Sequence, residues 1–94
     1  MNQLTDFQRS KYQTELPDWT MVEDRQIEKE FRFKDFKEAL SFVNKVGELA
    51  EQMNHHPNIY IHGWNKVKLT LTTFATKGLS SNDFLLAVKI NGIK

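Results

Sequence analysis

The order of hydrophobic patterns predicts an α+β domain, a four-stranded antiparallel sheet with helices packed on one face. Three observations predict it. Hydrophobic residues alternate along two segments, they recur every three or four residues along two others, and the strand-like segments come in pairs with short connections. Two hairpins separated by a helix favour a single antiparallel sheet. Because 94 residues can form only one hydrophobic core, we expect one domain over residues 1–94.

The first element is a weak helix over residues 1–16. Thr5 is its candidate N-cap, and Pro17 ends it because the residue before a proline is pushed out of helical geometry. Its scattered apolar residues are Leu4, Phe7 and Leu16.

The first hairpin pairs a short strand at residues 19–22 with a second strand that begins at Ile27, across a turn at residues 23–24. Lys29 interrupts the apolar face of the second strand at one position. The alternating residues are Ile27, Phe31 and Phe33 on one side and Glu28, Glu30 and Arg32 on the other. This pattern is typical of a strand with one buried face.

An amphipathic helix of about five turns follows. Asp35 stands at the N-cap position and Glu38 three residues later, which is a variant of the capping box. Phe42 and Leu49 widen the apolar arc, so they belong either to the core or to a helix contact between subunits. The residues at helical spacing are Phe36, Ala39, Leu40, Val43, Val46, Ala50 and Met53.

The second half repeats the scheme. A short strand at residues 59–62 and a turn at Gly63 lead to the clearest alternation of the chain, at Val67, Leu69 and Leu71, and Gly78 ends that strand. Ser80 then caps a final helix, with Asp83 in its first turn. The expected apolar side of this helix consists of Phe84, Leu85, Ala87, Val88 and Ile90.

Composition excludes several functions. The net charge of +1 gives no basic stripe, so we expect no nucleic-acid partner. The apolar runs fall far short of the roughly 20 residues that span a bilayer, and no signal peptide opens the chain, so we expect no membrane role. The absence of cysteine excludes disulfides, zinc ribbons and thiol catalysis, and it fits a cytoplasmic protein.

The candidate chemistry lies at a turn formed by His55, His56 and Pro57, just past the central helix. Histidine has an unperturbed pKa near 6.5 and can give or take a proton at neutrality, and proline would hold the rings in fixed directions. From spacing alone, a polar turn without function is an equally good interpretation. Glu51 lies four residues before His55 and could be its neighbour on the helix. Asp83 needs no functional explanation at this point, because its position as a helix cap is enough to account for it.

Metal binding is not indicated. Adjacent histidines rarely bind the same ion, His62 stands alone on a short strand, and no zinc-binding spacing is present.

Together, Glu51, His55, His56, Pro57, Trp64 and Asp83 resemble the signature of the pterin-4a-carbinolamine dehydratases. The stretches 31–36, 65–67 and 78–80 also look like this family. One position departs from the pattern, because Phe74 stands where the family has histidine or tryptophan. The resemblance implies the fold described above, assembly into homodimers or homotetramers, and dehydration of a 4a-hydroxytetrahydropterin to a quinonoid dihydropterin, with no cofactor or metal.

The resemblance also implies roles for individual residues. His55 would be the acid and base, and His56 would complete the catalytic pair by binding the ligand. The substrate-binding residues would be Glu51, Asn54, Pro57, Phe74 and Asp83, with Glu51 and Asp83 orienting an imidazole or the polar edge of the pterin.

Phe74 leaves three interpretations open, because a phenyl ring cannot transfer a proton. The enzyme works through His55 alone, or His62 supplies the missing imidazole, or catalysis is lost and the protein binds a pterin or a protein partner. In the last case Phe42 and Leu49 would be the contact residues.

Overall fold

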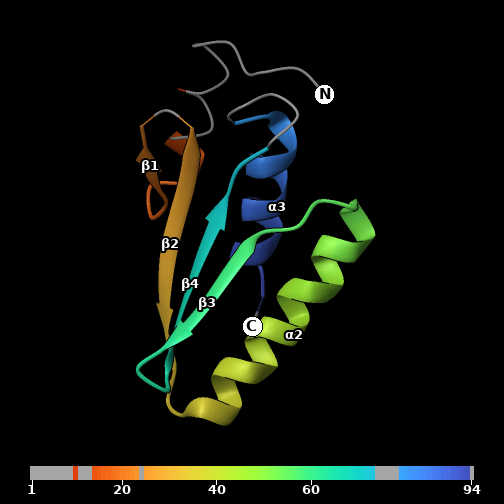
Figure 1. Cartoon of the computed structure of the whole chain (residues 1–94). Coiled ribbons are helices and arrows are strands. Elements are labelled where there is room, and N and C mark those ends of the chain that lie inside the picture. Colours follow the sequence, from red (N-terminus) through yellow and green to blue (C-terminus); the bar gives the residue numbers. More distant parts are fainter. Residues whose placement is uncertain (1–9, 11–13, 24, 74–78, 94) are drawn as a thin grey trace.

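The computed structural model describes residues 10, 14–23, 25–73 and 79–93. In this part of the chain, four strands form one antiparallel sheet in the order β1-β2-β4-β3, and helices α2 and α3 lie on the same side of it (Figure 1). The predicted α+β architecture is therefore confirmed. The elements are β1 (Thr20–Val22), β2 (Gln26–Arg32), α2 (Phe36–Met53), β3 (Asn58–His62), β4 (Lys66–Leu71) and α3 (Ser81–Asn91).

The register of the central strands separates a covered face from an open face. Ile27 pairs with Leu71 and Phe31 with Val67, so their side chains share the face that the helices cover. Val67, Leu69 and Leu71 are completely buried there, together with side chains from both helices in one core. The opposite face carries charged and polar residues. Helix packing on one face explains the alternation seen in the sequence.

Helix α2 begins and ends as its sequence requires. The Asp35 carboxylate accepts the N–H of Glu38 at 2.8 Å, as predicted, while Glu38 accepts the N–H of Lys34 at 3.2 Å. At the other end Asn54 adopts the left-handed conformation, with φ 50° and ψ 44°, which Asn tolerates better than most residues. The N–H of His55 then bonds to the carbonyl of Ala50. The helix end therefore fixes where the histidine turn starts.

The buried side of α3 differs from the expected one. Leu86 is buried, although it was not among the expected residues, whereas Leu85 and Val88 are 44% and 45% exposed. The buried stripe runs through Asp83, Leu86, Ala87 and Ile90, at spacings of three and four. The prediction was right for Phe84, Ala87 and Ile90, which are buried, and wrong for Leu85 and Val88.

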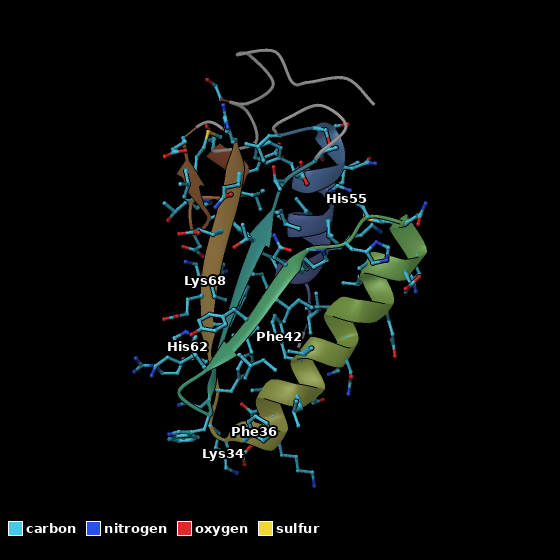
Figure 2. The ribbon with its side chains drawn as sticks, in the orientation of Figure 1. Lys34, Phe36, Phe42, His55, His62 and Lys68 are labelled. Atoms are coloured by element: carbon cyan, nitrogen blue, oxygen red, sulfur yellow. The ribbon has the colours of Figure 1, made fainter. Side chains whose placement is uncertain are left out.

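Phe42 is part of the core of this chain. Its ring centroid lies 4.7 Å from that of Phe31 and 4.9 Å from that of Phe33, and the residue is 7% exposed. Figure 2 shows Phe42 on the side of α2 that faces the sheet. Leu49 is partly buried against the same core.

Most of the predicted N-terminal helix, including Leu4, Thr5 and Phe7, lies outside the described residues, as do Asp24, Phe74 and Gly78. In the part that is described, residues 14–15 are helical, Pro17 is in a turn, and Leu16 and Trp19 are buried. No helix in the described ranges combines the length and the apolarity that crossing a bilayer requires.

Candidate active site

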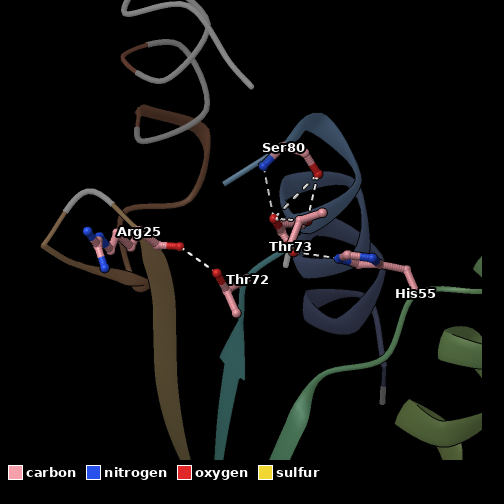
Figure 3. Close-up of polar contacts among 6 residues, drawn as sticks. Arg25, His55, Thr72, Thr73 and Ser80 are labelled. Carbon is pink, nitrogen blue, oxygen red and sulfur yellow. Dashed lines mark hydrogen bonds and ion pairs between the residues drawn. The ribbon is translucent and has the colours of Figure 1, made fainter. Parts of the chain in front are cut away.

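His55 is held by a buried carboxylate. Its Nε2 lies 2.5 Å from Oδ1 of Asp83, which comes from the first turn of α3, and the two side chains are 10% and 0% exposed (Figure 3). The two residues are 28 positions apart, and the packing of α3 beside the end of α2 brings them together. Because a carboxylate accepts hydrogen bonds, Nε2 donates in this pair.

The second oxygen of Asp83 is bonded as well. Oδ2 accepts the Thr73 hydroxyl at 2.7 Å and the backbone N–H of Ser80 at 2.9 Å. The hydroxyls of Thr73 and Ser80 are 2.9 Å apart. Since Thr73 gives its only hydroxyl proton to Asp83, Ser80 can donate to Thr73. In the described part of the chain, no buried side-chain nitrogen or oxygen lacks a partner. This network fixes the carboxylate and, through it, the imidazole of His55.

His56 has a looser and more exposed setting. Its Nε2 lies 3.4 Å from Oε1 of Glu51, with side chains 56% and 78% exposed. The helical spacing had placed Glu51 beside His55. Because α2 ends at Met53 and the left-handed Asn54 redirects the chain, His56 faces Glu51 while His55 turns inward to Asp83.

A cavity of about 410 Å³ opens at this turn. Asn54, His55, His56 and Pro57 form one wall, and threonines from β4 and just beyond it form the other. A second hollow adjoins it along α2 and shares His56 and Pro57, and Glu51 lines this second hollow. The remaining residues of the first cavity are Asn58, Thr70, Thr72 and Thr73. A volume of this size suits a small bicyclic ligand.

The structure brings most of the predicted site residues together. Asn54, His55, His56 and Pro57 line one cavity, Asp83 supports it from behind His55, and Glu51 lies in the neighbouring hollow. Trp64 is not part of this cavity. It is 63% exposed, with positive φ, in the turn between β3 and β4. Phe74 is outside the described residues.

His62 does not supply the missing imidazole within this chain. It ends β3, whereas the site lies where β3 begins, and Figure 2 shows His62 and His55 at different ends of the strand. Its partner is Glu30, with Nε2 and Oε1 2.5 Å apart on the open face of the sheet. That interpretation of the sequence was wrong.

Sequence reasoning missed the contribution of Thr73. It continues the alternation of Val67, Leu69 and Leu71, so its position predicted an inward side chain, and it is 7% exposed. An inward polar residue needs a buried partner, and this signal could have pointed to Asp83. Among the described residues, no three His, Asp or Glu side chains gather in an arrangement that could hold a metal ion.

The comparisons with known proteins show the family to which this chain belongs. The family model described as "Pterin 4 alpha carbinolamine dehydratase" matches residues 2–93. The chain belongs to this family. A relative from Rubrobacter xylanophilus, named "Putative pterin-4-alpha-carbinolamine dehydratase", is 46% identical over 82% of this chain and 71% of its own length.

Two solved structures share the fold. The crystal structure of a transcriptional coactivator/pterin dehydratase from Brucella melitensis has a TM-score of 0.88, with 33% identity and 97% of each chain covered. A pterin dehydratase-like protein described as a RuBisCO assembly factor of the alpha-carboxysome has a TM-score of 0.67 over 80% of this chain and 87% of its own. Its 22% identity shows the fold alone.

Proposed function

We propose that this protein is a hydro-lyase that dehydrates a 4a-hydroxytetrahydropterin to the quinonoid dihydropterin, with His55 as the acid and base. Membership of the dehydratase family supports the substrate class. The observation that carries the proposal is the imidazole of His55, held by the buried Asp83 at the wall of a cavity large enough for a bicyclic ring.

The hydrogen bond to Asp83 leaves Nδ1 as the nitrogen of His55 that exchanges protons with the substrate. A protonated ring gives its Nδ1 proton to the leaving hydroxyl, and the C4a–O bond breaks to release water. The N5 lone pair closes the N5=C4a double bond. The neutral ring then takes the N5 proton, so the cycle restores the protonated imidazole.

The neighbouring groups bind the pterin or position the imidazole of His55. His56 lies at the shared wall of the two hollows and Glu51 lines the second one, and both side chains are exposed, so they can contact the polar edge of the pterin. Asp83 is completely buried behind His55, so it orients the imidazole and does not contact the substrate. Thr73 is a positioning residue that acts through Asp83.

Phe74 favours a single-imidazole mechanism. The family pattern has histidine or tryptophan at that position, and no other histidine of the described chain reaches the cavity besides His55 and His56. General acid–base assistance from one group contributes about 10²–10⁴-fold. A site with one such group in place of two is therefore expected to be slower, and restoring histidine at position 74 should raise its rate.

A second candidate function is pterin binding without turnover, or a role as an interaction protein. The same Phe74 favours it. The similar protein from Brucella melitensis is described both as a transcriptional coactivator and as a pterin dehydratase, so a second activity is named for a relative of this chain. Tight binding of a dihydropterin with no acceleration of the reaction would support this candidate.

The deciding experiment follows the decay of freshly generated 4a-hydroxytetrahydropterin by absorbance. The wild type should accelerate the decay, His55→Ala should remove most of the acceleration, about 10²-fold or more, and Phe74→His should increase it. His62→Ala is the matched control, because it removes an imidazole at the other end of β3 and should change nothing. Equal rates for wild type, His55→Ala and buffer would refute the enzymatic function.

A further inference from the structure

Lys29 is a charged residue on the apolar face of the sheet that the helices cover. In β2 it lies between Ile27 and Phe31 and pairs across the sheet with the buried Leu69. Among the described sheet residues on this face, it is the one that carries a charge. An ammonium group on an apolar surface is unfavourable unless it finds compensating partners.

The partners of Lys29 offset only part of the cost of placing its ammonium group on an apolar surface. Its Nζ lies 3.2 Å from the amide oxygen of Asn91 and 4.7 Å from the centroid of the Phe31 ring, and its side chain is 20% exposed. Among the described residues, the carboxylate that forms an ion pair with it is Asp18, 3.8 Å away and 74% exposed, so water screens that ion pair. The site favours an additional anion at Nζ.

The ammonium borders a cavity of about 360 Å³ that is separate from the histidine site. Three phenylalanines and two isoleucines make up half of its lining residues, and Lys45 adds a second cation from α2. Among the described lining residues the acidic one is Glu38, which accepts the N–H of Lys34. The lining residues are Lys29, Phe31, Phe33, Glu38, Ser41, Phe42, Lys45, Ile90, Asn91 and Ile93.

We propose that this cavity binds a small planar aromatic carboxylate. The ring would pack against Phe31, Phe33 and Phe42, and the carboxylate would bind Lys29 with Lys45 nearby. Aromatic walls with a few charged groups are the usual construction of a site for such a ligand. Helix α2 continues from Lys45 to its end at Met53, about 12 Å along its axis, before the turn that carries His55, so this site does not depend on the proposed catalytic one.

Calorimetric titration with 2-naphthoate tests the proposal, with neutral 2-naphthamide as the matched ligand. We expect naphthoate to bind at micromolar to millimolar concentration and the amide to bind about tenfold more weakly, because it lacks the charge. Lys29→Met should weaken naphthoate binding about tenfold, Lys29→Arg should retain it, and Lys45→Met should weaken it less.

Two controls locate the ligand. Lys68→Met removes a lysine of the open face, which is paired with Glu28 at 3.3 Å, and should leave the affinity unchanged. His55→Ala should also leave it unchanged, since the two cavities are separate. Equal affinity for naphthoate and naphthamide, wild-type affinity in a folded Lys29→Met protein, loss of binding in His55→Ala, or no binding at all would each overturn the proposal.

Discussion

Two histidine–carboxylate pairs in this protein have the same contact length and opposite surroundings. His55 and Asp83 meet at 2.5 Å inside the protein, and His62 and Glu30 meet at 2.5 Å on the open face of the sheet. The side chains of the first pair are 10% and 0% exposed, and those of the second are 31% and 48% exposed. Water competes for the second pair and barely reaches the first. The comparison indicates that burial, and not distance, determines what such a pair contributes.

The two carboxylates also differ in the other contacts around them. Asp83 accepts hydrogen bonds from Thr73 and from the backbone of Ser80, so it joins the end of β4, the start of α3 and the histidine turn. The partner of Glu30, His62, stacks on the exposed Tyr60 ring with centroids 4.9 Å apart. Removing Asp83 therefore affects three segments, whereas removing Glu30 affects one surface contact.

The largest effect is expected for Asp83→Asn. The amide can accept from His55 or from Thr73 and Ser80, but its NH₂ group must then face one of these donors. We expect the free energy of unfolding to fall by about 3 kcal/mol, as for other broken buried pairs, and the dehydration rate to fall with it. Urea denaturation measures the first and the pterin decay assay the second. A loss below about 1 kcal/mol would contradict the importance assigned to burial.

Thr73→Val should have a smaller effect, about 1–2 kcal/mol, because it removes one donor to Asp83 and keeps the shape of the side chain. Its dehydration rate should fall while the pterin concentration for half-maximal rate stays the same, since Thr73 orients the imidazole through Asp83. A change in that concentration alone would show that Thr73 contacts the ligand directly. The same two assays distinguish these outcomes.

Glu30→Gln should cost about 0.5 kcal/mol or less, since the pair is exposed and screened. It is the matched control for Asp83→Asn, with the same chemical change at the same contact distance. Urea denaturation of both variants in one buffer gives the comparison directly. If the two losses were equal, the contrast between the pairs would be wrong.

Glu51→Gln should leave stability unchanged, because its contact with His56 is 3.4 Å long and both side chains are exposed. We expect it to raise the pterin concentration for half-maximal rate severalfold, since it would remove a charged contact to the substrate. Steady-state kinetics and urea denaturation separate the two effects. An unchanged half-maximal concentration would remove Glu51 from the substrate-binding residues.

The sequence was most informative where one local pattern decides the structure. The alternation of Val67, Leu69 and Leu71 predicted β4 and its buried face, and Asp35 with Glu38 predicted the start of α2. The turn at residues 54–57, which the sequence singled out for its two histidines, lines a cavity. These features depend on neighbours within a few residues, for which periodicity and capping rules are sufficient.

The sequence was less informative where a residue has two roles. Asp83 caps α3, as its position predicted, and also holds His55, which no local spacing reveals. The prediction for the apolar side of α3 included Leu85 and Val88, which are exposed, and omitted Leu86, which is buried. In the same way, the four-residue spacing predicted that Glu51 contacts His55. The left-handed Asn54 changes the direction of the chain, so the residue that contacts Glu51 is His56.

By itself, the amino-acid sequence determined the four strands, the central and final helices, the covered face of the sheet and the turn that carries the two histidines, because each follows from contacts between near neighbours. Only the tertiary structure decided which histidine is buried, which carboxylate it meets and on which face His62 lies. These pairings join residues about 30 positions apart. They arise from the packing of α3 beside the end of α2 and from the strand register, and no local pattern specifies either one.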